Sequence, residues 1–144
     1  MTALLLFLAA APMACPNLAR HVVRESAEHH VRPALLAAIA KVETGCNSRK
    51  VGRLGELGAW GILPTGSAAR SAKKHGMARP AKNAHLAAKH LRHLLDLCDG
   101  SEVAALGIYS ANRRRCDDRP TGYAERVLAV AGEPIATNQE QEGR

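Results

Sequence analysis

One predicted helix constrains the fold of this chain more than any other segment. Residues 31–46 read VRPALLAAIAKVETGC, and four side chains follow the spacing of a single helical face: Leu36, Ile39, Ala40 and Glu43. A carboxylate therefore lies at the end of an apolar stripe, where burial raises the pKa of a carboxyl group. A glutamate that keeps its proton near neutral pH can act as a general acid. Helical phase alone favours the simpler alternative, a surface glutamate that emerges at the helix end.

The composition predicts a single all-α domain. The chain has 144 residues, of which 47% are hydrophobic but only 3% aromatic, so Ala, Leu, Val and Ile must build the core. Ala- and Leu-rich periodic segments, together with Pro, Ser and Thr at their starts, predict helices rather than strands. Besides 31–46, the predicted helices cover residues 16–29, 65–76, 80–98, 101–111 and 122–131.

The segment that follows the predicted helix at 31–46 is rich in regularly spaced glycines. Gly52, Gly55, Gly58 and Gly61 recur at every third position, and Trp60, the only tryptophan in the chain, stands among them. The pattern predicts a tight loop, with a short hairpin, because glycine tolerates backbone angles that other residues avoid. Trp60 is predicted to form a wall that a ligand approaches; the alternative is ordinary core packing.

The N-terminal residues predict export. Residues 1–14 are apolar and rich in small side chains, too few for a transmembrane helix but typical of a signal peptide. Cleavage there leaves a domain at 15–132 and a polar tail at 133–144, which is predicted to be disordered. Lipidation at Cys15 is not favoured, because the residues before it match a lipoprotein box poorly. The alternatives are a buried N-terminal helix or a start at Met13.

The cysteines agree with export. Four cysteines, Cys15, Cys46, Cys98 and Cys116, suggest two disulfides in a small exported domain, with three possible pairings. Four reduced core cysteines are the alternative. No CxxC spacing is present, so a structural zinc site is not expected.

The histidines and the net charge say less about function. His90 and His93 share one helical face, with His85 less well phased, and favour a polar face over a metal site. The net charge of +7 suits an anionic partner: nucleic acid, a membrane surface or an acidic cell-wall polymer. The run 113–115 of three arginines fits phosphate or carboxylate contacts, or a solvated charge run.

Five segments in this order resemble one family. They are VETG at the helix end, GELGAWGILP in the loop, NAHLAAKHLRHLL, ALGIYSAN and GYAERVL. Together they are similar to the lytic transglycosylase domain of the soluble-transglycosylase (SLT) type, which has a lysozyme-like fold. The resemblance covers about residues 31–130.

The resemblance assigns roles to single residues. Glu43 falls on the catalytic acid, and Tyr109 on the tyrosine that lies beside the acid in the family. Asn83 falls on the asparagine that begins the long helix, and Gly55 and Gly58 on loop glycines that let backbone amides approach the sugar. The predicted substrate-binding residues are Thr44, Gly58, Trp60, Gly61, Tyr109, Asn112 and Tyr123.

Several positions depart from the family pattern. Gly61 stands where a glutamine that contacts substrate is usual, Ser110 where asparagine is usual, and Asn112 where glycine is usual. Cys46 and Cys98 fall where aromatic residues are common, which suggests that a disulfide replaces aromatic packing. These departures change the expected substrate contacts but leave the acid in place.

The resemblance implies a peptidoglycan lytic transglycosylase. Such an enzyme cleaves the bond between N-acetylmuramic acid (MurNAc) and N-acetylglucosamine (GlcNAc) without water, forms 1,6-anhydroMurNAc ends, and needs no metal or organic cofactor. The implied partners are peptidoglycan strands and a secretion, conjugation or phage envelope complex, with no nucleic acid and no stable membrane insertion after signal cleavage.

Three alternative functions remain open. A muramidase of the same fold would hydrolyse the same bond, for which Glu56 is a candidate second carboxylate, although loop structure or a rim contact is the favoured role of Glu56. A catalytically weak domain would bind glycan as an assembly factor. A basic helical nucleic-acid binder is disfavoured by the leader and the cysteines.

Overall fold

The computed structural model describes residues 13–64 and 76–132. The predicted tail, almost all of the predicted signal peptide and all but the last residue of the predicted helix at 65–76 lie outside these residues. Among the helices that are described, none is long and apolar enough to cross a membrane.

The described part of the chain is helical, as predicted. A 3-10 helix, η1 (Pro16–Leu18), leads into α1 (Ala19–His29). The longer helices that follow are α2 (Pro33–Thr44) and α4 (Pro80–Leu97), and the chain closes with α5 (Glu102–Tyr109) and α6 (Gly122–Ala131). Within the described residues, the Gly-rich loop forms isolated antiparallel bridges, Val51 with Leu57 and Leu57 with Ile62, instead of regular strands.

Local chemistry explains where these helices begin and end. Pro33 and Pro80 occupy first-turn positions, where the missing N–H of proline costs nothing. The hydroxyl oxygens of Ser101 and Thr121 accept hydrogen bonds from backbone N–H groups in the first turns of α5 and α6. Gly45 ends α2 in the left-handed conformation, at φ 65°.

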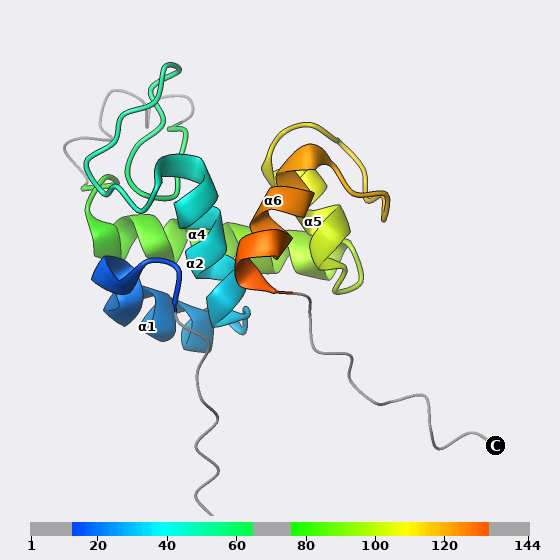
Figure 1. The fold of residues 1–144 in the computed structure, drawn as a ribbon, viewed down its shortest axis with the longest axis horizontal. Coiled ribbons are helices and arrows are strands. Elements are labelled where there is room, and N and C mark those ends of the chain that lie inside the picture. The colour runs from blue at the N-terminus through cyan, green and yellow to red at the C-terminus, as the bar shows by residue number, and fades with distance from the viewer. Residues whose placement is uncertain (1–12, 65–75, 133–144) are drawn as a thin grey trace, which may run out of the picture.

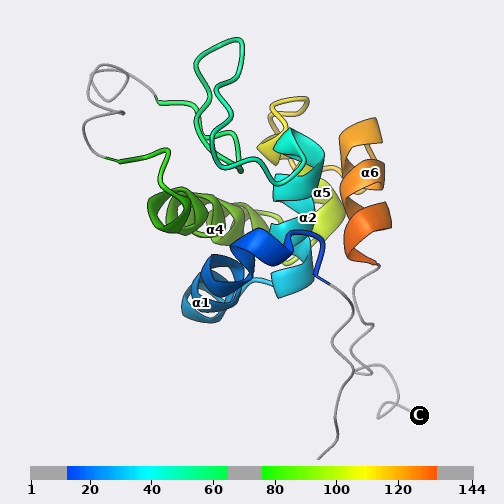
Figure 2. The same ribbon diagram turned by 60° about the vertical axis from the view of Figure 1, so that its left-hand side comes forward.

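Helix α2 lies at the centre of the molecule. It packs against α1 on one side and α6 on the other, while α1 also packs on α4 and α4 on α5 (Figures 1 and 2). The six residues from Leu35 to Ala40 are all buried, so α2 is enclosed on nearly every side. Glu43 comes one turn after this enclosed segment. The centre of the core therefore fixes the position of the carboxylate.

Two disulfides connect the ends of these helices. Cys15 is bonded to Cys46 and Cys98 to Cys116, which selects one of the three possible pairings. The first bond joins the segment before α1 to the end of α2, next to the loop that follows Glu43. The second joins the end of α4 to the loop after α5.

Candidate active site

Glu43 lies half-buried in the last turn of α2, and among the described residues its side chain has one hydrogen-bond partner. The hydroxyl of Tyr123, near the start of α6, donates to Oε1 of Glu43 at 2.7 Å. The two residues are 80 positions apart and are brought together because α6 packs along α2. The carboxylate at the end of the apolar stripe is therefore held toward a second helix and does not emerge freely into solvent.

The pKa of Glu43 is raised above its usual value of 4.5, mainly because burial disfavours the charged form. The hydrogen bond from Tyr123 acts in the opposite direction, the nearby charge of Glu56 raises the pKa further, and Arg126 lowers it. Desolvation outweighs the lowering contributions. A carboxyl group in this environment retains its proton to higher pH than a solvated one, as a general acid requires.

The Gly-rich loop approaches Glu43 at Gly61. A Cβ added to Gly61 would stand 3.6 Å from Oε2 of Glu43, and the backbone of Gly61 has φ 60°. A glutamine here, as in the family pattern, would thus begin in contact with the acid. Gly61 leaves that volume open beside the carboxylate, and its backbone angle is one that glycine adopts without strain.

Asn83, fully buried at the start of α4, holds the loop in place. Its side-chain oxygen accepts from the backbone N–H of Trp60 at 2.9 Å, and its amide donates to the carbonyls of Leu57 at 2.8 Å and Met77 at 3.0 Å. A Cβ on Gly58 would lie only 2.5 Å from the Asn83 side chain. Gly58 is therefore required by packing against Asn83.

The loop glycines do not present free amides to a ligand, in contrast to the expectation from the family. The N–H of Gly58 donates to the carbonyl of Lys50 at 3.0 Å, and that of Gly61 donates to Gly58 at 3.1 Å. The N–H of Gly55 likewise donates to the carbonyl of Gly52 at 3.1 Å. These amides stabilise the loop itself. The glycines contribute to the site through their small size and backbone angles.

A cavity of about 250 Å³ opens between the end of α2 and this loop. Glu43 and Glu56 both line it, and so do two exposed cations, Lys50 and Arg53. The described residues that line it are Glu43, Thr44, Lys50, Gly52, Arg53, Glu56, Gly58 and Gly61. A polar cavity with a half-buried acid at one wall and cations at its rim suits a polar ligand that carries negative charge.

Glu56 is the second carboxylate of this cavity, and it also has a role in the loop. Its Oε2 accepts from the backbone N–H of Leu54 at 3.0 Å, which closes a tight turn. The predicted loop role of Glu56 is thus present in the structure. Its charge nevertheless raises the pKa of Glu43, so the two carboxylates act on each other electrostatically.

Thr44 and Trp60, both predicted substrate contacts, have mainly structural partners. The Thr44 hydroxyl lies 2.8 Å from the carbonyl of Ala59 and ties the end of α2 to the loop. The Trp60 side chain is fully buried and donates from Nε1 to the carbonyl of Leu36 at 2.8 Å. The prediction that Trp60 forms a cleft wall is therefore wrong, and its alternative, core packing, is what the structure shows.

Tyr109 and Asn112 are the remaining predicted site residues. Tyr109, expected to lie beside the acid, has a buried hydroxyl that finds no hydrogen-bond partner among the described residues, and its ring packs against His90 at 5.4 Å between centroids. Burial, and to a smaller extent the charge of Glu43, raises the pKa of Tyr109, but the tyrosine that bonds to Glu43 is Tyr123. Asn112 is exposed in the loop after α5.

Lys50 and Arg53 were not among the predicted site residues. Lys50 comes before the first of the loop glycines and Arg53 lies between Gly52 and Gly55, in a segment whose backbone path is set by hydrogen bonds. Two basic residues beside regularly spaced glycines were the sequence signal that could have identified them. The arginines of 113–115 line a different hollow, together with Cys116, Asp117 and Arg119. Of the described residues, the cations that line the cavity beside Glu43 are therefore Lys50 and Arg53, in the Gly-rich loop.

The enclosed central helix and the half-buried glutamate beside a cavity define an all-helical domain of the lysozyme-like type. The chain belongs to the transglycosylase SLT domain family, whose model matches residues 21–122. This confirms the family and the fold class predicted from the sequence. No match was found among curated proteins.

The chain is also similar to a solved structure of the lytic transglycosylase Slt from Pseudomonas aeruginosa, determined for an inactive mutant with glutamine in place of a glutamate. The TM-score is 0.63 and the sequence identity 20%, over 78% of this chain and 23% of that one. At this identity the likeness shows the fold. The chain spans less than a quarter of the length of that relative.

Proposed function

We propose that this protein is a lytic transglycosylase that cleaves the MurNAc–GlcNAc β-1,4 bond of peptidoglycan and leaves 1,6-anhydroMurNAc ends. The observation that carries the proposal is Glu43: a half-buried carboxyl with a raised pKa, at a cavity wall, hydrogen-bonded to Tyr123. Membership of the SLT family supports the substrate class.

Glu43 serves first as an acid and then as a base in the proposed reaction. Its proton passes to the glycosidic oxygen as the bond to C1 of MurNAc breaks, and the substrate's N-acetyl group offsets the positive charge at C1. The ionised Glu43 then removes the proton of the C6 hydroxyl, whose oxygen bonds to C1 and closes the anhydro ring. The acid thereby regains its proton, and no water is consumed.

The groups around Glu43 serve this cycle in different ways. Tyr123 holds the carboxyl and stabilises its charged form between the two proton transfers, because a donated hydrogen bond favours the carboxylate. The open volume at Gly61 leaves room for a sugar next to Oε2. Lys50 and Arg53 suit the lactyl and peptide carboxylates of muramoyl residues. We also propose that the protein acts outside the cytoplasm, in local wall opening for an envelope-spanning machine.

A muramidase is the second candidate, and Glu56 is the observation that favours it. Hydrolysing glycosidases generally need two carboxylates, and Glu56 lines the same cavity as Glu43. In that mechanism Glu56 would activate water or act as the nucleophile. Its hydrogen bond with Leu54 occupies one carboxylate oxygen and leaves the other available.

Mass spectrometry of digested peptidoglycan separates the two activities. Anhydromuropeptides are expected from the wild-type protein, whereas hydrolysis gives reducing ends about 18 Da heavier, from one added water. Glu56→Gln should keep the anhydro products if Glu43 acts alone and abolish products if Glu56 is catalytic. Asp99→Asn, an exposed carboxylate-to-amide change outside the cavity, is the matched control. Exclusive reducing-end products would contradict the proposal.

A further inference from the structure

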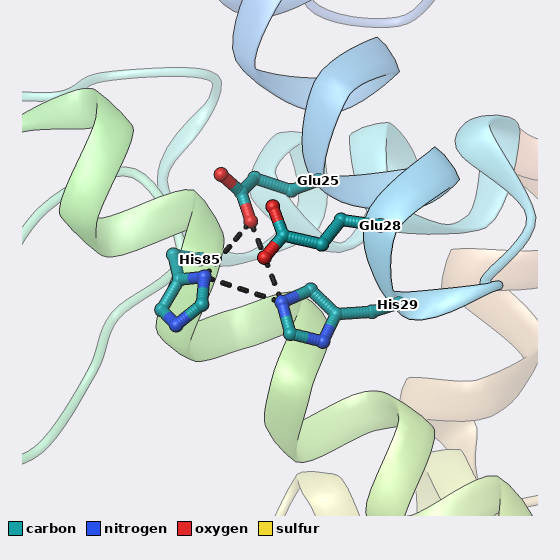
Figure 3. Close-up of side chains that lie close together, drawn as sticks. All are labelled: Glu25, Glu28, His29 and His85. Atoms are coloured by element: carbon teal, nitrogen blue, oxygen red, sulfur yellow. Dashed lines mark hydrogen bonds and ion pairs between the residues drawn. The ribbon is translucent and has the colours of Figure 1, made fainter.

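A second cluster of ionisable side chains lies between α1 and α4 and shares no residue with the cleft cavity. Glu25, Glu28 and His29 come from the last turns of α1, and His85 comes from the second turn of α4 (Figure 3). One ligand atom from each of the four lies within 4.8 Å of those of the others. Figure 3 shows the two imidazole rings and the two carboxylates directed at a common point.

The pattern on α1 explains why three of these side chains meet. Glu25, Glu28 and His29 are related as i, i+3 and i+4, so they occupy one helical face. That face packs on α4 and there meets His85, which is 56 residues further along the chain than His29. A search for ligand spacings within a single helix does not find this group, because its members come from two helices.

Three of the ligand atoms form a triangle with nearly equal sides. Nδ1 of His85 lies 3.0 Å from Oε2 of Glu25 and 3.2 Å from Nε2 of His29, and Nε2 of His29 lies 3.5 Å from Oε2 of Glu25. A tetrahedral Zn²⁺ with ligands at about 2.0 Å separates neighbouring ligand atoms by about 3.3 Å. The triangle matches one face of such a tetrahedron, and Glu28 is placed to complete the set.

Protons cannot satisfy all three contacts at once. An imidazole nitrogen carries either one N–H or one lone pair. Nδ1 of His85 therefore either accepts from His29 or donates to His29 or Glu25, and no placement of the protons gives the triangle three hydrogen bonds. A single cation at its centre accepts a lone pair from each of the three atoms at the same time.

The burial of these groups increases the cost of leaving them without a cation. The side chain of Glu25 is 8% exposed, that of His29 16% and that of His85 35%, while Glu28 lies at the surface. Two carboxylates and two neutral imidazoles carry a charge that a divalent cation cancels. Mixed imidazole and carboxylate sets suit Zn²⁺ and its first-row neighbours rather than Mg²⁺ or Ca²⁺, which prefer oxygen ligands.

We propose that Glu25, Glu28, His29 and His85 form a binding site for a divalent transition metal, best matched by Zn²⁺, that fastens α1 to α4. Neither disulfide makes this connection, since one joins the segment before α1 to the end of α2 and the other follows α4. The metal would thus brace the side of the molecule that the disulfides leave unlinked. It is distinct from the proposed glycosidic chemistry and does not depend on it.

The test is a titration of the full chain, free of any histidine tag and with its disulfides formed, with Zn²⁺ alone. Calorimetry is expected to give one site per molecule. At a free Zn²⁺ concentration of about one hundred times Kd, the unfolding equilibrium constant should fall by about 100-fold. Co²⁺ at the same site should show the visible absorption of tetrahedral coordination, and EDTA should reverse both effects.

Matched variants place the site. His85→Gln and His29→Gln should each lose at least about 100-fold in affinity, since loss of an outer-shell partner of a metal ligand already costs about 10–100-fold. His93→Gln, exposed on the same helix as His85, should bind as the wild type does. If a histidine variant fails to fold, Glu28→Gln replaces an exposed side chain and should still weaken binding. Unchanged Zn²⁺ affinity in these variants, or no stoichiometric binding by the wild type, would overturn the proposal.

Discussion

The two ends of α2 hold opposite charges in very different ways. At its start, the guanidinium of Arg32 donates to both carboxylate oxygens of Glu102, at 3.1 and 2.7 Å, and to the carbonyls of Ala131 and Gly132, at 3.2 and 2.8 Å. At its other end, Glu43 has a raised pKa and, within the part of the chain that the structure describes, one donor, Tyr123. The charge of Arg32 is thus stabilised by four hydrogen bonds, whereas Glu43 is desolvated and its charged form is less well stabilised.

This difference separates stability from chemistry along one helix. Arg32 connects the starts of α2 and α5 with the end of α6, so its hydrogen bonds fix the frame of the domain. Glu43 gains its proposed reactivity because no comparable set of donors stabilises its charge. A carboxylate with four donors would ionise readily and could not hold a proton for transfer. Substitution of Arg32 should therefore change mainly the free energy of unfolding, and substitution of Glu43 should change mainly the catalytic rate.

The largest expected effect is on activity, in Glu43→Gln. Loss of a general acid lowers rates by about 10²–10⁴-fold, and because Glu43 is proposed to act in both proton transfers we expect the upper end of that range. The measurement is muropeptide release under conditions where the variant is shown to be folded. Activity within tenfold of the wild type would remove Glu43 from the catalytic role.

The same variant should not lose stability at neutral pH. The folded-state pKa of Glu43 is raised above 4.5, so the folded state binds the proton more tightly, and this stabilisation is lost as pH rises through the folded pKa. Glu43→Gln carries no charge to desolvate and should be the more stable protein above that pH. Urea unfolding without reductant should show the difference shrinking below about pH 4.5. If the stability of Glu43→Gln minus that of the wild type is lower at pH 8 than at pH 4, the pKa of Glu43 is not raised in the folded state.

Asn83→Ala should give the largest loss of stability at the cleft end, about 3 kcal/mol. It leaves the N–H of Trp60 and the carbonyls of Leu57 and Met77 without their partner, and each buried unsatisfied group costs about 1–3 kcal/mol. Chemical denaturation measures this loss. Asn112→Ala, at an exposed position, is the matched control and should stay within about 0.5 kcal/mol. Equal stabilities of the two variants would mean that Asn83 does not hold the loop.

Arg32→Met tests the opposite end and should cost about 2 kcal/mol. It leaves the carboxylate of Glu102, only 11% exposed, without its partner. Removing one partner of a fully buried ion pair costs about 3–5 kcal/mol. The partial exposure of Arg32 reduces this cost. Activity per folded molecule should be unchanged. Arg114→Met, at an exposed arginine, is the control. In the double variant with Glu102→Gln, part of the loss should be recovered, whereas purely additive losses would show that the pair is not coupled.

The helices and the acid could be predicted from the sequence because their signals are local. Proline at first-turn positions, hydroxyl caps and Gly45 set helix ends within a few residues, and the stripe ending in Glu43 needs only helical phase. Tyr123 was placed at the cleft through the order of motifs in the family.

Contacts between distant segments could not be predicted in the same way. Which tyrosine reaches Glu43 depends on how α6 packs on α2, and local periodicity carries no information about that packing. The buried position of Trp60 depends on its bond to Leu36, and the cysteine pairing depends on the path of the loops. The group of Glu25 and His85 arises only where two helices meet.

The smallest expected effect is a shift in the pH dependence of activity, which distinguishes Tyr123 from Tyr109. The hydrogen bond from Tyr123 lowers the pKa of Glu43, so Tyr123→Phe should raise that pKa further. Because the proposed acid must be protonated, the alkaline limb of kcat/KM against pH should move to higher pH, while the maximum rate falls by about tenfold as the carboxyl loses its orientation.

Tyr109→Phe is the matched control, since it removes a buried hydroxyl that has no partner. Its stability should stay within about 0.5 kcal/mol of the wild type or increase, because no hydrogen bond is lost. Its pH profile should be unchanged. If the profile shifts in Tyr109→Phe and not in Tyr123→Phe, then Tyr109 tunes the acid in the working enzyme, and the contrast between the two ends of α2 would rest on a different donor.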